Sequence, residues 1–286
     1  MEIKKICVLG AGIMGHGIAQ VCAQGGYDVK MRDIEDRFVQ AGLERIGKFL
    51  EGSVERKRMT KEEADATMSR IKGVTDLKEA AKDADLVIEA IIENLEIKKN
   101  TYIELDAICP PHTIFASNTS YQSITEMAAV TKRPEKFLGT HWFNPPPIMR
   151  GIEVVKGEKT SQDTLDTIVE LCKKLGKEPG VCKDSRGFIV NRLIQPWRNE
   201  ALKMFDEGVA SFQDIDTAYK VGYGFRMGPF EYLDLVGIEL AAVGNEVFYN
   251  EFKSDTFKLA QCHKLKVRAG DFGRKTGRGF YEYGKK

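Results

Sequence analysis

Among the four histidines of the sequence, His141 is placed best to exchange a proton with a substrate. Oxidation of an alcohol by hydride transfer needs a base that takes the hydroxyl proton, and imidazole can do this near neutral pH. His141 ends the apolar run Phe137-Leu-Gly-Thr-His141 and is followed by Trp142-Phe-Asn144. Considered alone, it could equally be a satisfied histidine of the core. The other three lie on a helix after a glycine-rich turn, in a Pro-Pro-His turn and in a basic C-terminal segment (His16, His112 and His263).

Glu153 is an acidic residue within the otherwise apolar segment Ile152-Glu-Val-Val155. A carboxylate in a buried strand is costly unless it is paired, and an imidazole N–H is a suitable partner. A pair between Glu153 and His141 would leave one ring nitrogen as an acceptor toward the substrate, and it would stabilise the imidazolium formed during oxidation. The alternative is a structural ion pair between Glu153 and another cation.

A glycine-rich turn near the N-terminus has the spacing of a dinucleotide site. Gly10, Gly12 and Gly15 satisfy G-x-G-x-x-G between the apolar run Ile6-Cys-Val-Leu9 and residues 18–23, which have helical spacing. The first glycine permits a tight turn, the second lets the backbone approach the pyrophosphate, and the third lets the helix pack close to the strand. The free N–H groups at the start of the helix would bind the phosphates.

Asp33 ends the second expected strand, Tyr27-Asp-Val-Lys-Met-Arg-Asp33. An acidic side chain at this position can accept both ribose hydroxyls of an adenosine, and its charge would repel a 2′-phosphate. This favours NAD over NADP. Arg32 could instead bind a 2′-phosphate, although neighbouring residues of a strand face opposite sides of the sheet.

The remainder of the first half alternates between strand and helix patterns. This alternation predicts an α/β fold with a Rossmann-type, doubly wound, mostly parallel sheet. The expected strands cover residues 85–90, 113–117 and 137–141, and the expected helices cover 96–108 and 123–130.

Polar residues follow the expected carboxyl ends of these strands. Ligands of doubly wound sheets bind beyond the carboxyl ends of the strands, so the polar groups should converge where chemistry occurs. The clusters are Ile92-Glu93-Asn94, Ser117-Asn118-Thr119-Ser120 and His141-Trp142-Phe143-Asn144.

The length of 286 residues exceeds the roughly 100 to 200 residues of one domain. We therefore expect two domains, an NAD-binding domain at 1–185 and an all-α domain at 186–286. A helical arm at about 38–70 should be inserted in the first, and Thr60 with Glu63 predicts a capping box inside it. The arm could lie over the cofactor or could be simple surface packing. In the second domain, helices are expected at 189–207, 211–221 and 229–248, with a final segment from about 254.

The composition excludes several classes of partner. The net charge is +1 and the basic residues are scattered among acidic ones, so we expect no nucleic-acid partner. Six cysteines without a C-x-x-C pair are interpreted as reduced thiols, and we expect no metal site. There is no signal-peptide pattern, and no apolar run approaches the ~18 residues of a membrane helix. We therefore expect a cytoplasmic protein without a membrane partner.

Several motifs together resemble the 3-hydroxyacyl-CoA dehydrogenase family, particularly the short bacterial 3-hydroxybutyryl-CoA dehydrogenases. The resemblance covers essentially the whole chain. The matching segments are Gly10-Ala-Gly-Ile-Met-Gly15, Asp85-Leu-Val-Ile-Glu-Ala90, Ala116-Ser-Asn-Thr-Ser120, His141-Trp-Phe-Asn-Pro145, Gly187-Phe-Ile-Val-Asn-Arg192, Met227-Gly-Pro-Phe-Glu231 and Lys275-Thr-Gly-Arg-Gly-Phe-Tyr281.

The resemblance implies NAD-dependent, reversible oxidation of (S)-3-hydroxyacyl-CoA to 3-oxoacyl-CoA. It makes His141 the general base in oxidation and Glu153 the residue that orients it. Ser120 and Asn191 would hydrogen-bond the reacting oxygens of the substrate, and Lys48 is a candidate CoA contact. The family also forms a homodimer through the C-terminal domain. The implied NAD contacts are Gly10, Gly12, Ile13, Met14, Gly15, Asp33, Glu93, Lys98, Ser120, Asn144 and Lys275.

Departures from the family pattern leave the acyl group open. The departures are Tyr121 in place of a second Ser, Trp142 in place of a common Phe, Met149-Arg150-Gly151 in place of Met-Lys-Leu, and the bulk and charge of Trp197 and Arg198. One hypothesis is an acyl tail with a carboxylate or a ring that meets Arg150 or Arg198, and the alternative is surface charge with conservative core changes. Two other hypotheses are a dehydrogenase of free β-hydroxy acids and an NAD-binding sensor without turnover.

Overall fold

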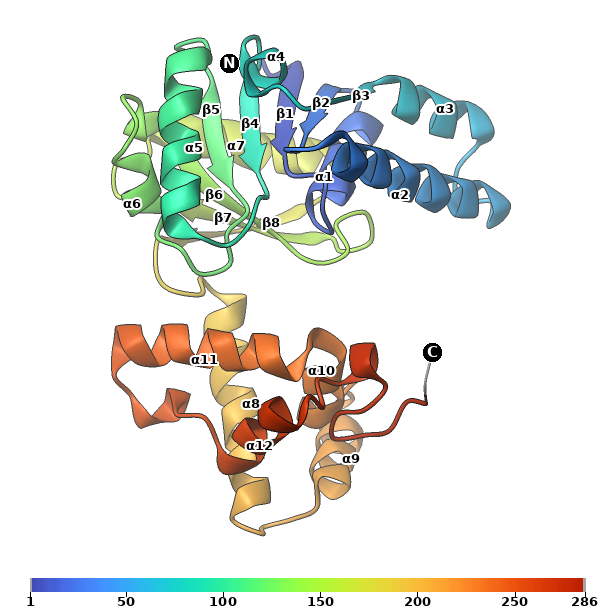
Figure 1. Ribbon diagram of the computed structural model, residues 1–286, viewed down its shortest axis with the longest axis vertical. Coiled ribbons are helices and arrows are strands. Elements are labelled where there is room, and N and C mark those ends of the chain that lie inside the picture. Colours follow the sequence, from blue (N-terminus) through green and yellow to red (C-terminus); the bar gives the residue numbers. More distant parts are fainter. Residues whose placement is uncertain (1, 285–286) are drawn as a thin grey trace. The chain divides into compact units, whose positions relative to one another are not determined.

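The computed structural model describes residues 2–284, which form two compact units with the boundary between Ser185 and Arg186. The first unit is built on a twisted sheet with helices on both faces, and the second unit is helical (Figure 1). Each unit has its own hydrophobic core. Among the described residues, no helix is both long and apolar enough to span a bilayer.

The sheet of the first unit has eight strands within the described residues, in the order β3-β2-β1-β4-β5-β6-β7-β8. All neighbouring pairs are parallel except β6 and β7, which are antiparallel. The predicted doubly wound, mostly parallel sheet is confirmed. The strands are β1 (Lys5–Leu9), β2 (Asp28–Arg32), β3 (Ile71–Val74), β4 (Leu86–Glu89), β5 (Ile114–Ser117), β6 (Phe137–Trp142), β7 (Gly151–Lys156) and β8 (Glu178–Lys183).

The central strands are apolar on both faces because helices cover both. Every residue of β4, β5 and β6 is buried, as expected for parallel strands inside a doubly wound sheet. One face packs on α1 (Gly15–Gln24) and α7 (Gln162–Lys174). On the other face, Tyr102 of α5 (Leu95–Ile108) packs on Phe115 and Phe137. The short helices α4 (Leu77–Ala81) and α6 (Ile124–Ala128) complete the unit.

The expected arm consists of α2 (Asp36–Glu55) and α3 (Lys61–Ser69), which lie side by side in Figure 1. The predicted capping box is present, since the Thr60 hydroxyl accepts from Glu63 N and the Glu63 carboxylate accepts from Thr60 N. Ile46 and Leu50 of α2 join the core of the unit, so the arm is anchored by apolar packing. The elements β3 and α4, which follow the arm, were not predicted from the sequence, and neither were α7 and β8.

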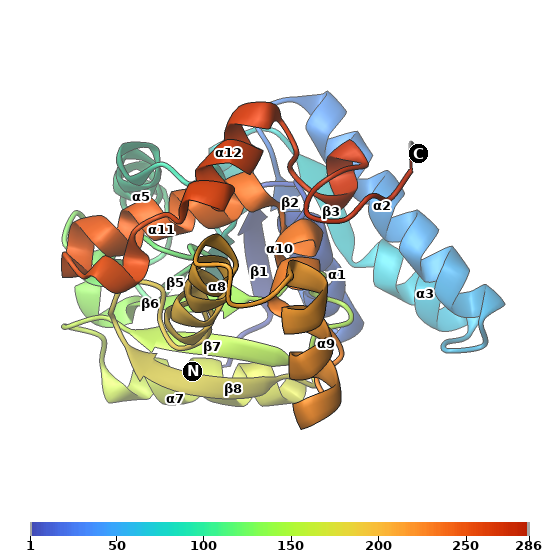
Figure 2. The same ribbon diagram turned by 90° about the horizontal axis from the view of Figure 1, so that it is seen from below.

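In the second unit, α8 (Val190–Asp206) packs against the other four helices of that unit among the described residues (Figure 2). The prediction of one helix over 229–248 is wrong, because the segment forms two helices. They are separated by Gly237, whose φ of 102° is rarely adopted by residues with a side chain. The other helices are α9 (Phe212–Tyr223), α10 (Pro229–Val236), α11 (Ile238–Phe252) and α12 (Gln261–Ala269).

Asp216 of α9 fastens the start of α10 and the C-terminal segment together. It is fully buried, and its carboxylate accepts hydrogen bonds from the backbone N–H groups of Phe230 and Glu231 at 2.9 and 3.0 Å. It also accepts from the Tyr281 hydroxyl at 2.9 Å. The N-cap of α10 is Gly228, which has no side chain, so Asp216 supplies the cap from another helix.

We expect Asp216→Ala to lower the free energy of unfolding by about 3 kcal/mol, because it leaves one buried and two partly buried donors without this acceptor. Urea unfolding of the full chain measures this loss. Asp214→Ala is the matched control, because Asp214 lies on the same helix, is exposed and accepts only a local hydrogen bond from Ser211 Oγ through its side chain. The control should lose less than about 1 kcal/mol, and equal losses in both variants would contradict the prediction.

Candidate active site

The three glycines of the first turn have the geometry that a dinucleotide requires. Gly10 has a φ of 98°, and an added Cβ would overlap the carbonyl of Ala90. An added Cβ on Gly15 would overlap the carbonyl of Gly10, so the helix can approach the strand only without a side chain there. At Gly12 an added Cβ would meet no atom within 4 Å. The backbone therefore packs tightly around Gly10 and Gly15, whereas the space beside Gly12 is open to a ligand.

The surroundings of this turn also fit a dinucleotide. No side chain caps the N-terminus of α1, so its first N–H groups can bind an anion. The Asp33 carboxylate accepts from Ala11 N at 2.8 Å and from Ile34 N at 2.7 Å, which fixes both the turn and the acid beside it. Arg32 Nε donates to the carbonyl of Thr75 at 2.8 Å. That hydrogen bond gives Arg32 a structural role.

His141 and Glu153 form a buried pair across the antiparallel strands β6 and β7. The register places the two residues directly opposite each other, so their side chains leave the same face of the sheet. His141 Nδ1 lies 2.6 Å from Glu153 Oε2, and the residues are only 6% and 3% exposed. A carboxylate accepts, so Nδ1 donates and the neutral ring has Nε2 as its acceptor.

The Nε2 side of the imidazole faces Ser120, which lies in the loop after β5. Ser120 Oγ lies 3.2 Å from His141 Nε2. Phe143 packs edge-on against the ring with 5.1 Å between centroids, and this contact limits how the ring can turn. Asn144 is exposed in the loop after β6. Of the two ring nitrogens of His141, Nδ1 is paired with Glu153, so Nε2 is the one that can exchange a proton with a substrate.

A second buried cluster lies at the ends of β4 and β5. Lys98 Nζ is 2.5 Å from Glu89 Oε1 and 3.2 Å from Glu93 Oε2. The Glu93 carboxylate also accepts from Thr119 Oγ1 and from the backbone N–H of Ser120. Thr119 belongs to the polar cluster expected at the end of β5, whereas Glu89 was not predicted as a site residue. The signal that singled out Glu153, an acid inside an apolar strand, is also present at Glu89.

The remaining predicted contacts are distributed over both units. Lys48 is exposed on α2, and Ile13 and Met14 lie in the glycine-rich turn, where Ile13 is exposed. Asn191 begins the first turn of α8 in the second unit. Lys275, also in the second unit, forms an ion pair with Glu239. The roles of these residues stay predictions.

The two arginines considered for an unusual acyl tail differ in their surroundings. Arg150 is exposed and forms an ion pair with Glu178 at the start of β8. Arg198 is buried in the second unit, where it donates to Gln195 and lies over the ring of Tyr232. Arg150 therefore matches the alternative of ordinary surface charge.

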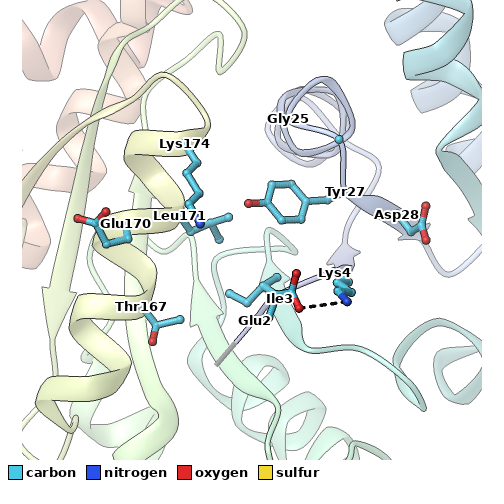
Figure 3. A pocket seen from close by; sticks show the side chains of 11 residues that line it. Glu2, Ile3, Lys4, Gly25, Tyr27, Asp28, Thr167, Glu170, Leu171 and Lys174 are labelled. Atoms are coloured by element: carbon cyan, nitrogen blue, oxygen red, sulfur yellow. Dashed lines mark ion pairs between the residues drawn. The ribbon is translucent and has the colours of Figure 1, made fainter.

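A hollow of about 510 Å³ lies in the first unit at the amino ends of β1 and β2, the edge of the sheet opposite to the glycine-rich turn. Figure 3 shows the Tyr27 ring, next to the amino end of β2, pointing toward Leu171 and Lys174 of α7, and Lys4, next to β1, paired with Glu2. Ligands of doubly wound sheets bind at the carboxyl ends, so this hollow is not the dinucleotide site.

Family models match nearly the whole described chain. The model of the 3-hydroxyacyl-CoA dehydrogenase NAD binding domain matches residues 5–185, and the model of the C-terminal domain matches residues 187–283. The chain belongs to the 3-hydroxyacyl-CoA dehydrogenase family. The resemblance noted in the sequence is confirmed, and the first unit of this dehydrogenase is an NAD-binding domain.

Individual relatives agree along the full length of the dehydrogenase. It is 41% identical over 286 residues to a probable 3-hydroxybutyryl-CoA dehydrogenase of Bacillus subtilis, covering 100% of this chain and 99% of that protein. It is 41% identical over 287 residues to the mitochondrial hydroxyacyl-coenzyme A dehydrogenase of Sus scrofa, covering 98% of this chain and 91% of that protein. The crystal structure of (S)-3-hydroxybutyryl-CoA dehydrogenase from Ralstonia eutropha has a TM-score of 0.96 and 40% identity, covering 99% and 100%.

Proposed function

We propose that this dehydrogenase oxidises (S)-3-hydroxyacyl-CoA to 3-oxoacyl-CoA reversibly, with NAD as the cofactor and His141 as the acid–base group. The observation that carries the proposal is the position of His141, with Nδ1 paired to Glu153 and Nε2 facing Ser120. The names of the relatives from Bacillus subtilis and Ralstonia eutropha supply the substrate class.

NAD held by the glycine-rich turn and Asp33 would supply the acceptor for the hydride that leaves the carbon bearing the hydroxyl group. His141 Nε2 takes the hydroxyl proton, and the buried Glu153 carboxylate stabilises the imidazolium that results. Ser120 Oγ is close enough to His141 to hydrogen-bond the same substrate oxygen, and in the reverse direction the imidazolium returns the proton. We assign Asn191 to a second hydrogen bond with the reacting part of the substrate, and Asn144 to the nicotinamide end.

Turnover of NADH with acetoacetyl-CoA tests the proposal directly, with free acetoacetate as the comparison substrate. We expect oxidation of NADH with the thioester and little with the free acid. Turnover of the free acid alone would favour a dehydrogenase of free β-hydroxy acids. Binding of NADH without turnover of either compound would favour a sensor, and both results would overturn the proposed substrate class.

We expect Asp33→Ala to reduce the preference for NADH over NADPH by at least about 10-fold in kcat/KM. The carboxylate would accept the ribose hydroxyls and repel a 2′-phosphate, and both effects end with its removal. Steady-state assays with the two cofactors measure the ratio. Asp36→Ala, an exposed acid at the start of α2, is the control. An unchanged ratio in Asp33→Ala would contradict the assignment of Asp33 to the adenosine ribose.

A homodimer through the second unit forms part of the proposal. On α11, Ile238 and Ala241 are buried in the core of the unit, whereas Leu240 and Val243 remain 59% and 54% exposed. Two apolar side chains on the outer face of one helix are consistent with burial by a second copy. Leu240→Glu together with Val243→Glu should shift the mass measured by sedimentation toward a monomer.

A further inference from the structure

The Glu89 carboxylate is completely buried and has four hydrogen-bond donors around it. Oε1 accepts from Lys98 Nζ at 2.5 Å and from Ile91 N at 2.9 Å. Oε2 accepts from Ser117 Oγ at 2.7 Å and from Tyr102 OH at 3.4 Å. Burial of an ionised carboxylate is costly, and it is tolerated when the charge is paired and hydrogen-bonded. Glu89 meets both conditions.

Lys98 connects Glu89 to the edge of the sheet. Its side chain is 1% exposed and its ammonium lies between two carboxylates, those of Glu89 and Glu93. The Glu93 side chain is 39% exposed, so of the two only Glu89 is a fully buried counter-ion. Glu89 therefore fixes where the ammonium lies, and the ammonium fixes one oxygen of Glu93.

The other oxygen of Glu93 holds the loop that carries Ser120. Glu93 Oε1 accepts from Thr119 Oγ1, from Ser120 N at 3.1 Å and from Tyr121 N at 3.3 Å. Ser120 Oγ in turn lies 3.2 Å from His141 Nε2. A continuous series of polar contacts thus leads from the buried Glu89 to the atom that exchanges the proton.

We propose that Glu89 is a positioning residue for the reaction: through Lys98 and Glu93 it holds the backbone of Ser120 so that the serine hydroxyl stays within reach of His141. The inference deepens the proposed function and rests on it. Without the charge of Glu89, the Lys98 ammonium loses its buried counter-ion, and Glu93 loses the contact that orients it toward the loop. A displacement of about 1 Å at a reacting group can cost on the order of 100-fold in rate.

A double-mutant cycle tests the inference. Glu89→Gln keeps the volume of the side chain and removes its charge, and we expect it to lower kcat roughly 10-fold to 100-fold. If Glu89 acts through the serine, the same change made in Ser120→Ala should lower kcat less than about 3-fold, because the positioned group is already gone. Equal losses in both backgrounds would overturn the inference.

The ion pair between Asp106 and Arg133 provides a matched control. Asp106 lies near the C-terminal end of α5, the helix that carries Lys98 in its first turns. Its Oδ1 is 2.7 Å from Arg133 Nε, and the side chains of Asp106 and Arg133 are 6% and 11% exposed. Asp106→Asn breaks a buried pair of similar burial that does not contact the Ser120 loop. Asp106→Asn should leave kcat within about 2-fold of the wild-type value, and it should change kcat by the same factor in the Ser120→Ala background. If Glu89→Gln does not fold, Tyr102→Phe removes one of the four hydrogen bonds to Glu89 and should show the same coupling to Ser120→Ala with a smaller loss of kcat.

Amide hydrogen exchange separates this inference from the proposed function. We expect the N–H groups of Ser120 and Tyr121 to exchange faster in Glu89→Gln than in the wild type, and to be unchanged in Asp106→Asn. This measurement requires no substrate. A wild type that does not turn over acetoacetyl-CoA would defeat the proposed function, whereas unchanged exchange at the two amides would defeat the positioning role of Glu89.

Discussion

Replacement of His141 with alanine should lower kcat by roughly 10² to 10⁴ while NADH binding is retained. The ring supplies the only histidine nitrogen that the structure places beside Ser120 among the described residues. Without it, the hydroxyl proton has no positioned acceptor, and the developing charge loses the stabilisation that Glu153 provides through the ring. Acetoacetyl-CoA reduction measures kcat, and NADH fluorescence measures cofactor binding.

The control for this substitution is His112→Ala. His112 is exposed and pairs with Asp85 at 3.0 Å, near the amino ends of the strands. It should keep kcat within about 2-fold, as is usual for a surface change distant from the reacting groups. A His141→Ala enzyme with nearly normal kcat would show that another group exchanges the proton.

Glu153→Gln should lower kcat by about 10² to 10⁴ with little change in NADH binding. The carboxylate requires a proton on Nδ1 of His141, which leaves Nε2 as the acceptor. A glutamine can present its NH₂ group to Nδ1, which would place the ring proton on Nε2, and it offers no charge to stabilise the imidazolium. Pre-steady-state reduction of acetoacetyl-CoA measures the effect on the chemical step.

Glu178→Gln is the matched control for Glu153→Gln. Glu178 lies on the neighbouring strand β8 and pairs with Arg150 at the surface. Exposed ion pairs contribute about 0 to 1 kcal/mol to the free energy of unfolding. Glu178→Gln should therefore keep both the stability and the reduction rate of the wild type. A rate loss of similar size in the two glutamine variants would indicate a general disturbance of the sheet.

Much of the fold could be predicted because the central strands are buried on both faces. Runs such as Ile6–Leu9 and Leu86–Ile88 have no polar side that could be mistaken for a helix face. The strand β3 was missed because Ile71-Lys-Gly-Val74 is short and partly exposed. The break at Gly237 was missed because a glycine within a helical pattern does not show whether its φ is positive.

The candidate site was predictable where a single polar residue interrupts an apolar strand. That signal led to Glu153 and would also have led to Glu89. The contact between Lys98 and Glu93 depends on the path of the chain after β4, and no periodicity describes that path. The direction of β7 was equally hidden, since an apolar run looks the same in a parallel and in an antiparallel strand.

The antiparallel pairing of β6 with β7 ties the chemistry to the hydrophobic core. His141 and Glu153 leave one face of the hairpin, whereas Trp142, Ile152 and Val154 enter the core with α1 and α7 on the other. A slip of one residue between the strands would separate the acid–base pair and, in the same step, turn the apolar side chains of β7 away from that core. The register that is stable is therefore also the register that is active.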